Sequence, residues 1–364
     1  MASEDSATRV EPRDDPEEDP VAYFLRDMEY HGKSDRTIDA YERVLRRFEA
    51  FLADPERSPS EAMTPAEAGQ RECMAWVHDL RGDLAPSTVA TYASYLHRFY
   101  AYMVQVGAFD ANPMGLVREE MDESIDTDPT RREVTLPGMR AFVAGIGHPL
   151  DRALVVTFLK TGIRVGELCN LDLRDLSVDH PVRTTLPDPR PAIDGRPDSL
   201  YVDGNIARGD RVEDEERTAA NKRERSTVVP VDDELRATLV RWLAIRPDAV
   251  SNALFVSTGD SWGERLTPAM VRGRVEKHAR AAGWYRSGGS AEENVTPHYF
   301  RHFFTTHLRD RTGDRGIVKY LRGDVADDVI DTYTHNWGDR VRETYEATMY
   351  SLFEGPTDRS RDVA

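Results

Sequence analysis

The sequence predicts a protein of two domains, an all-α domain followed by an α+β domain with a small antiparallel sheet. Apolar residues recur three and four positions apart in the first third of the chain, which is the period of an amphipathic helix. Further along, the short β-rich runs SLYVDG and STVVPV lie between helical segments and predict strands. A chain of 364 residues is also long for a single core.

Composition places the domain boundaries. Residues 1–20 are acidic, contain proline and lack periodicity, so we expect a disordered leader. The helical domain is expected over residues 21–120. The polar segment MDESIDTDPTRRE, residues 121–133, is broken by Pro129 and predicts a linker. The second domain is expected over residues 134–350, with a flexible tail over residues 351–364.

Three helices are expected in the first domain. One begins at Ser34, and its apolar face is formed by Ile38, Tyr41, Leu45, Phe48 and Leu52. Another follows Ser87, a suitable N-cap, and repeats that spacing from Val89 to Met103. Between them, MTPAEAGQRECMAWVHDLRG predicts a third helix that carries Met74 and Val77. Periodicity alone does not separate such a domain from a helical interaction module.

The second domain begins with two expected helices, LPGMRAFVAGIG and LDRALVVTFLKTG. The two strand candidates follow, and helices return from Asp232 onward. Residues 180–221 are rich in proline, aspartate and arginine and are long for a connection. We therefore expect an extended surface excursion around the strand pair.

The formal charge of −17 is unusual for a nucleic-acid-binding protein, because such domains are usually basic. Carboxylates are spread over the whole chain and lysines are few among the basic residues, which leads to the hypothesis of a halophilic archaeal source. In about 1 M salt, charges are screened within about 3 Å. Local contacts would then decide whether DNA binds.

Several classes of protein are not indicated. No apolar run reaches the roughly 20 residues of a membrane span, and the N-terminus has no secretory signal pattern, so we expect a soluble cytoplasmic protein without a membrane partner. The two cysteines, Cys73 and Cys169, cannot form a zinc site alone. We assign them no chemical role.

Four separated segments of the second domain carry side chains suited to a phosphate. In TFLKTGIRVGEL, Arg164 begins a new turn and could donate a fork of hydrogen bonds. In NKRERSTVVPV, Lys222 lies eight residues before Pro230 and could protonate a leaving oxygen. In KYLRGDVADDVIDTYTH, Tyr333 lies near the end of a short helical pattern. Taken singly, each of these residues has an ordinary structural explanation.

The remaining segment, VTPHYFRHFFTTHL, is more informative. Thr296 suits an N-cap and Pro297 the first helical position, which places His298 and Arg301 on one face of the first turn. A helix N-terminus favours an anion through its free N–H groups and its dipole. Two side-chain donors at the same end strengthen that indication.

The order Arg, Lys, His-x-x-Arg, Tyr resembles the tyrosine recombinase or phage integrase family, including its Xer-type members. TGIRVGEL is similar to the first arginine box of that family, HYFRH to its HxxRH box and YTH to its nucleophile box. In the first domain, SDRTIDAYERVLRRFEAFL and PSTVATYASYLHRFYAYM resemble the SAM-like core-binding domain. The resemblance covers most of the chain, and it implies a tyrosine recombinase catalytic domain after the SAM-like domain.

The resemblance implies a role for each matching residue. Tyr333 would attack the scissile phosphate, forming a 3′-phosphotyrosyl bond without ATP. Arg164 and Arg301 would hold the non-bridging oxygens, the role that metals fill in many nucleases, so the resemblance implies neither a metal nor a cofactor. Lys222 would be the general acid, and His298 would support proton transfer. The implied partner is double-stranded DNA, bound by a tetramer on the recombining sites. The alternatives considered for Lys222 are Arg223 and Arg225, and those for the nucleophile are Tyr345 and Tyr350.

One position departs from the family pattern. Nine residues before Tyr333 the family usually has histidine or tryptophan, and here that place is taken by Asp324. An anion beside a phosphate should repel it. We therefore expect Asp324 either to point away and orient a neighbouring base, accepting from Arg322 or a backbone N–H, or to leave the donor role at this sixth catalytic position to Arg322.

Two other functions stay open at this point. A non-catalytic DNA-binding protein descended from recombinases is motivated by Asp324. A type IB topoisomerase uses similar chemistry, although the core-binding domain and the YTH box favour recombination. The sequence does not indicate the DNA site, or whether the reaction serves integration and excision or the resolution of chromosome dimers.

Overall fold

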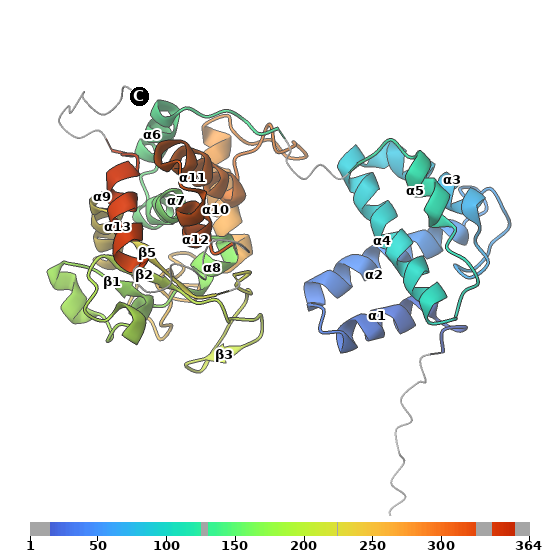
Figure 1. The fold of residues 1–364 in the computed structure, drawn as a ribbon, viewed down its shortest axis with the longest axis horizontal. Helices are drawn as coiled ribbons and strands as arrows, with labels where there is room; N and C mark the ends of the chain where they lie inside the picture. The colour runs from blue at the N-terminus through green and yellow to red at the C-terminus, as the bar shows by residue number, and fades with distance from the viewer. Residues whose placement is uncertain (1–14, 125–129, 224, 325–336, 354–364) are drawn as a thin grey trace, which may run out of the picture. The chain divides into compact units, whose positions relative to one another are not determined.

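The computed structural model describes residues 15–124, 130–223, 225–324 and 337–353. The chain forms two compact units that divide between residues 128 and 129, a position inside the predicted linker. Each unit has its own hydrophobic core. Figure 1 shows the first unit in blue to cyan and the second in green to red.

The first unit is all helical within its described residues, as the sequence predicts. Its helices are α1 (Pro20–Tyr30), α2 (Asp35–Leu52), α3 (Gln70–Asp83), α4 (Pro86–Gln105) and α5 (Met114–Glu120).

The start of α1 corrects the predicted leader. The carboxylate of Asp19 accepts a hydrogen bond from the Ala22 N–H at 2.9 Å and pairs with Arg46 of α2 at 2.8 Å. Because an N-cap aspartate and a following proline are strong signals for a helix start, the fold begins before residue 21. Residues 1–14 lie outside the described residues.

Two details of α3 and α4 also differ from the expectation. Ala85, not Ser87, is the N-cap of α4, because Pro86 takes the first helical position, where its missing N–H costs nothing. In α3 the core positions are Cys73, Trp76, Val77 and Leu80, whereas Met74 is 43% exposed. The start of α2 is confirmed, since the Ser34 hydroxyl accepts from the Thr37 N–H.

The second unit is an α+β fold. Its helices are α6 (Leu136–Ala144), α7 (Pro149–Thr161), α8 (Val165–Asn170), α9 (Asp233–Leu243), α10 (Pro268–Ala281), α11 (Pro297–Thr312), α12 (Arg315–Arg322) and α13 (Trp337–Thr348). Its strands are β1 (Leu176–Ser177), β2 (Ser199–Val202), β3 (Arg211–Val212), β4 (Glu215–Glu216) and β5 (Thr227–Pro230). No helix in the described ranges is both long and apolar enough to cross a membrane.

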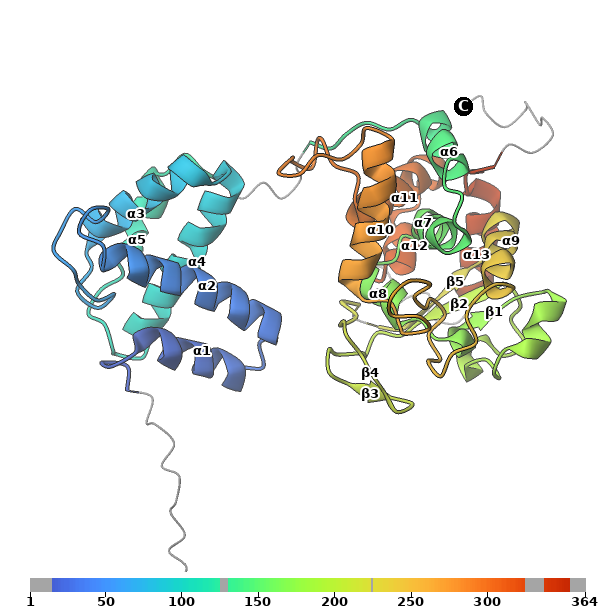
Figure 2. The same cartoon turned by 180° about the vertical axis from the view of Figure 1, so that it is seen from behind.

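Helix α7 is the centre of the second core. It is buried from Leu150 to Thr161 except at Arg152 and packs mainly against α9 and α11, with further contacts from α6 and α10. Figure 2 shows α7 among these helices from behind. A helix surrounded in this way holds its C-terminal end in a fixed position, and Arg164 follows that end by three residues.

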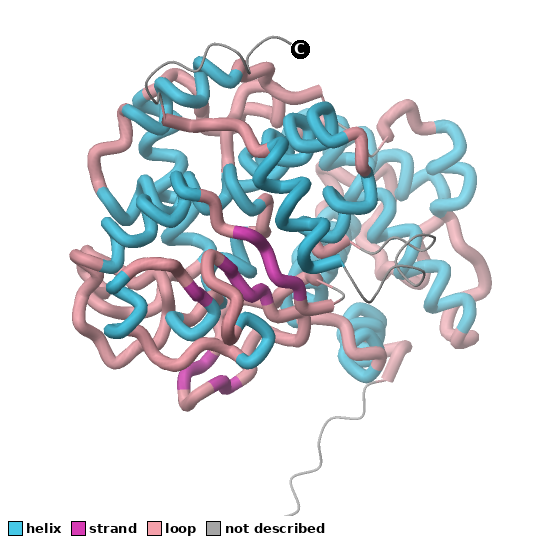
Figure 3. Tube along the Cα trace, turned by 60° about the vertical axis from the view of Figure 1, so that its left-hand side comes forward, coloured by secondary structure: helices cyan, strands magenta, loops and turns pink. Residues whose placement is uncertain are grey.

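Strands β1, β2 and β5 form an antiparallel sheet in that order, drawn in magenta in Figure 3. Leu200 of β2 pairs with Leu176 of β1 on one side and Val229 of β5 on the other, and all three are buried. The two predicted strands are thus confirmed as neighbours. Both α12 and α13 contact β5, so the sheet supports the helices that precede and follow the predicted nucleophile.

Residues 180–221 are not only a surface excursion. Besides the predicted strand β2 they contain the β3–β4 hairpin, and they bury Arg217, which is 1% exposed. The Arg217 guanidinium donates two hydrogen bonds to Asp172, at 2.9 and 2.7 Å, and Arg265 donates to the same carboxylate at 2.6 Å. This buried ion cluster attaches residues 180–221 to the rest of the domain. The polar composition of the segment gives no sign of that attachment.

The predicted flexible tail is wrong for residues 351–353. The Glu234 carboxylate accepts hydrogen bonds from the N–H groups of Leu352 and Phe353, at 2.7 and 3.0 Å. The buried Lys160 ammonium lies 2.7 Å from Glu234 and donates to the Tyr350 carbonyl at 2.6 Å. The end of the described chain is therefore anchored to α7 and α9.

Candidate active site

The turn after α7 determines where Arg164 lies. Gly162 ends the helix with φ 63°, and a side chain there would meet the Phe304 ring at 2.3 Å. Both the left-handed backbone and the close approach of α11 thus require glycine. The chain continues directly into α8, with Arg164 at the N-cap.

Arg164 is held by Glu167, three residues further on. The Glu167 carboxylate accepts from the Arg164 backbone N–H at 2.8 Å and from its guanidinium at 3.0 Å. Arg223 donates to the same carboxylate at 3.2 Å. Burial alone would raise the pKa of Glu167, but Arg223 and the hydrogen bonds from Arg164 hold it below its usual value. An ionised Glu167 thus orients the Arg164 side chain.

Arg301 reaches the same place from α11. Its Nη1 donates to the carbonyls of Gly162 and Arg322, at 2.7 and 3.0 Å, which leaves Nη2 for a further acceptor. The residue is 2% exposed. Burial, followed by the nearby charge of Arg164, lowers the pKa of Arg301 to about 10. The guanidinium is therefore still charged at neutral pH.

Asp324 lies at the point where these arginines converge. Its Oδ1 accepts from Arg164 at 2.7 Å and from Arg301 at 2.8 Å, and its Oδ2 lies 2.9 Å from Arg322. The Asp324 backbone N–H donates to the Lys319 carbonyl at 3.0 Å and closes the end of α12. One carboxylate thus forms ion pairs with three guanidinium groups.

This geometry corrects one expectation for Asp324. The expected contact with Arg322 is present, but the carboxylate does not point away from the predicted phosphate position. Instead it takes the place between Arg164 and Arg301. The physical reason is that guanidinium groups held together at low exposure repel one another, and the carboxylate reduces that repulsion.

The charge of the cluster favours an anion even with Asp324 present. The guanidinium groups of Arg164, Arg223, Arg301 and Arg322 face the carboxylates of Glu167 and Asp324, so four positive charges meet two negative ones. Two positive charges remain. A group of three or more histidine, cysteine or acidic side chains able to hold a metal is absent from the described residues.

His298 occupies the first turn of α11 and is exposed. Partial loss of solvent around the ring, and then the charges of Arg131 and Arg301, lower its pKa. A neutral imidazole at pH 7 can accept or donate a proton. Thr296 holds the N-cap position as predicted, but its side chain makes no capping hydrogen bond.

Lys222 is exposed, and no hydrogen bond joins it to the arginine cluster within the described chain. Its neighbours are fixed: Asn221 bonds to Asn170 and to the Asp203 carbonyl, at 2.8 and 2.7 Å. Arg223 is buried against Glu167, so it is not free to replace Lys222 at a solvent-facing phosphate.

Tyr333 lies outside the described residues. The two tyrosines considered as substitutes are in the core. Tyr345 donates to the Lys160 carbonyl and Tyr350 to the Leu159 carbonyl, and burial raises the pKa of both well above the usual value. Neither hydroxyl can reach DNA in this fold.

The sequence assigned no role to Glu167, and it offered Arg223 only as an alternative to Lys222, not as a partner of Glu167. Glu167 had a signal, because a glutamate three residues after an N-cap is the spacing of a capping box. The buried position of Arg223 had no signal, since an arginine inside the charged run NKRER is typical of a solvated surface.

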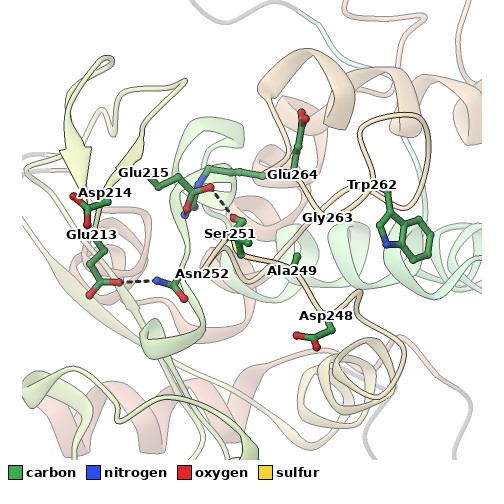
Figure 4. A pocket seen from close by; sticks show the side chains of 12 residues that line it. Glu213, Asp214, Glu215, Asp248, Ala249, Ser251, Asn252, Trp262, Gly263 and Glu264 are labelled. Carbon is green, nitrogen blue, oxygen red and sulfur yellow. Dashed lines mark hydrogen bonds and ion pairs between the residues drawn. The ribbon is translucent and has the colours of Figure 1, made fainter.

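A separate hollow of about 780 Å³ lies beside the β3–β4 hairpin. Figure 4 shows Glu213 and Glu215 hydrogen bonded to Asn252 and Ser251 at this hollow. Its lining includes none of the predicted site residues. Because carboxylates repel phosphate, this hollow is not the phosphate site.

The helical unit, the α+β unit and the converging arginines define a two-domain protein equipped to hold a phosphate-like anion. Residues 147–338 match the phage integrase family, and residues 21–107 match its N-terminal SAM-like domain. The chain belongs to the phage integrase family and is a tyrosine recombinase, an enzyme that breaks and rejoins DNA strands.

Curated relatives and solved structures agree with this assignment. Tyrosine recombinase XerC of Pelotomaculum thermopropionicum is 25% identical over 336 residues, which cover 86% of this chain and 91% of the relative. The XerC of Chromohalobacter salexigens is 26% identical, with 90% and 94% covered.

Two solved structures share the fold. A lambda integrase dimer bound to a COC' core site has a TM-score of 0.58 at 15% identity, covering 85% of this chain and 95% of that chain. The integrase of transposon Tn1549 in complex with circular intermediate DNA has a TM-score of 0.57 at 16% identity, with 93% and 97% covered.

Proposed function

We propose that this recombinase acts at specific DNA sites through Tyr333, with Arg164 and Arg301 holding the scissile phosphate. The observation that carries the proposal is that both guanidinium groups donate to a single oxygen of Asp324, at 2.7 and 2.8 Å. A carboxylate and a phosphodiester each carry one negative charge and two oxygen acceptors. The place that Asp324 takes therefore suits the non-bridging oxygens of a phosphate.

In the proposed reaction, the Tyr333 oxygen attacks phosphorus and forms a 3′-phosphotyrosyl bond while the bond to the 5′ oxygen breaks. The Tyr333 hydroxyl gives its proton to the neutral His298, and the 5′ oxygen gains one from the Lys222 ammonium. One phosphate ester replaces another, so rejoining needs no ATP. The arginines stabilise the negative charge that develops at phosphorus.

The two remaining roles follow from the surroundings of each residue. The neutral His298, at the N-terminus of α11, contacts the phosphate and assists proton transfer. Arg322 supplies a third donor in place of the histidine or tryptophan that the family usually has at position 324, because its guanidinium lies 2.9 Å from the Asp324 carboxylate.

Asp324 itself has to leave before a phosphate can bind. In the DNA-free protein it offsets one positive charge of the cluster, and a phosphodiester that replaces it keeps the charge balance unchanged. We propose this exchange in place of the orienting role that the sequence suggested. The same carboxylate also motivates the rival function, a DNA-binding protein without cleavage activity.

The partner we propose is double-stranded DNA bound by a tetramer. A solved lambda integrase is a tetramer bound to a Holliday junction, with a TM-score of 0.58 to this chain. The proposed location is the cytoplasm, where a prokaryotic chromosome or mobile element would be reached. Integration or excision of such an element and resolution of chromosome dimers both fit this chemistry.

The experiment is to trap covalent adducts on genomic DNA, sequence the attached ends and build a nicked suicide substrate from them. The wild type should form an adduct, and Tyr333→Phe should form none while it still binds the site. Tyr30→Phe is the control, because Tyr30 is 76% exposed in the first unit. Equal adduct from Tyr333→Phe would overturn the assignment, and binding without any wild-type adduct would favour the rival. Relaxation of supercoils without a specific site would indicate a topoisomerase.

A further inference from the structure

We infer that Arg223 is a positioning residue for DNA cleavage, which holds Glu167 and thereby fixes the Arg164 guanidinium at the scissile phosphate. The inference rests on the proposed function of the arginine cluster. Arg223 is 4% exposed, and the groups that it contacts belong to the protein. It therefore acts through its neighbours.

The Arg223 guanidinium joins three elements. One Nη2 contact goes to Glu167, the residue at the start of α8 that orients Arg164, at 3.2 Å. The other goes to the Leu321 carbonyl near the end of α12, also at 3.2 Å. Nη1 donates to the Thr227 hydroxyl in β5. The residue thus connects the Arg164 turn, the sheet and the end of α12.

The end of α12 is shaped around this side chain. Gly323 has φ 68°, and a Cβ there would lie 2.5 Å from the Arg223 side chain. The glycine that precedes Asp324 leaves the space in which Arg223 lies. The position of the Asp324 carboxylate and the position of Arg164 consequently depend on the same buried guanidinium.

Arg223 also explains how an ionised Glu167 is tolerated. The carboxylate is 1% exposed, and a buried charge needs compensating partners. Arg164 supplies one, but Arg164 also has to present its second nitrogen to the phosphate. With Arg223 as a second partner, Glu167 can hold Arg164 without drawing it away from the phosphate.

The planar fork of an arginine suits this task better than an ammonium. Three acceptors on different elements are met by two terminal nitrogens in a fixed plane. A lysine would keep the charge but could not hold the three acceptors in this arrangement. Arg223→Lys is thus a variant that preserves the charge and loses the geometry.

The test is single-turnover cleavage of the nicked substrate at saturating DNA. Arg223→Met should cleave about 100-fold slower than wild type, since a displacement of about 1 Å near the reacting atoms can cost that much. Arg223→Lys should lose about 10-fold, and it decides the question if the Met variant does not fold. Arg241→Met, an exposed arginine on α9, is the matched control and should cleave like wild type. Wild-type rates in both Arg223 variants would overturn the inference.

Two further measurements separate positioning from a general loss of stability. If Arg223 acts through Glu167, the double variant Glu167→Gln/Arg223→Met should be no more than about threefold slower than the slower single variant, because residues that act as a unit are not additive. If instead the fold reductions of the two single variants multiplied in the double variant, the inference would be overturned.

The second measurement uses a substrate with sulfur in place of the bridging 5′ oxygen. A thiolate leaves without a proton, so this substrate should restore cleavage by Lys222→Ala. Arg223→Met should stay slow, because its defect lies at the phosphate oxygens. Full restoration of Arg223→Met would assign its role to Lys222 instead and overturn the inference. Failure of the proposed function would look different, as a wild type that forms no adduct on either substrate.

Discussion

Replacing Asp324 with asparagine should make the site bind phosphate more tightly. The substitution keeps the size of the side chain and an oxygen acceptor but removes the negative charge. In the wild type, an incoming phosphate must displace a carboxylate that forms ion pairs with Arg164 at 2.7 Å, Arg301 at 2.8 Å and Arg322 at 2.9 Å. In the variant, the competing group is a neutral amide.

The structure sets the size of the effect. The Asp324 side chain is 27% exposed, and its partners range from 3% exposed for Arg301 to 31% for Arg322. An exposed ion pair contributes about 0.2–1 kcal/mol, and a hydrogen bond to a charged group about 1.5–3 kcal/mol. A value near 2 kcal/mol for this half-buried contact corresponds to about 30-fold in phosphate affinity.

The same interaction stabilises the folded protein. The free energy of unfolding should fall by about 2 kcal/mol in Asp324→Asn, because the arginines lose their counter-charge in the folded state only. Added phosphate should restore that stability, since a ligand that binds the folded state stabilises it by mass action. The loss in free energy of unfolding and the gain in phosphate affinity should therefore correspond to the same free-energy change.

The assay is denaturant unfolding over a series of inorganic phosphate concentrations, with ionic strength held constant. Asp310→Asn is the control, because it removes the same charge from an exposed side chain on α11. The phosphate midpoint should shift about 30-fold for Asp324→Asn and stay unchanged for the control. An unchanged midpoint together with unchanged stability would refute the exchange of Asp324 for phosphate.

Three other outcomes are expected. Arg322→Ala should cleave at least about 10-fold slower than wild type in single-turnover assays, as loss of a charge-assisted donor implies; Arg315→Ala on the same helix is the control, and an equal rate would remove Arg322 from the site. The pKa of His298 is lowered in the folded state, so its contribution to stability is present above the usual pKa of 6.5 and is lost as pH falls. Melting temperatures at pH 7.5 and 5.5 should therefore differ less for His298→Asn than for wild type. For a halophilic protein, log affinity for DNA should fall only weakly with log salt and folding should need high salt, so a steep slope with a stable fold in dilute buffer would reject that source.

The fold was largely accessible from the sequence, because its signals are local. Apolar spacing identified α2 and α4, and β-rich runs identified β2 and β5. The helix starts that were predicted wrongly also have local causes. Asp19 and Pro20 start α1 at the border of an acidic segment, and a proline moved the N-cap of α4 by two residues. The anchoring of Leu352 by Glu234 joins residues that are 118 positions apart, and no local pattern reports it.

The site also contains residues that local motifs predict and residues that only their tertiary contacts identify. The sequence by itself predicts Arg164, Lys222, His298, Arg301 and Tyr333 as site residues in this order, because these side chains occur within recognisable local motifs. Only the tertiary structure shows which groups Asp324 and Arg223 contact. Both lie in charged segments that read as solvent-exposed, and each contacts groups from elements far apart in the chain. Whether a charged side chain is solvated or holds a buried partner depends on which distant groups the fold brings to it, and that information is absent from the local sequence.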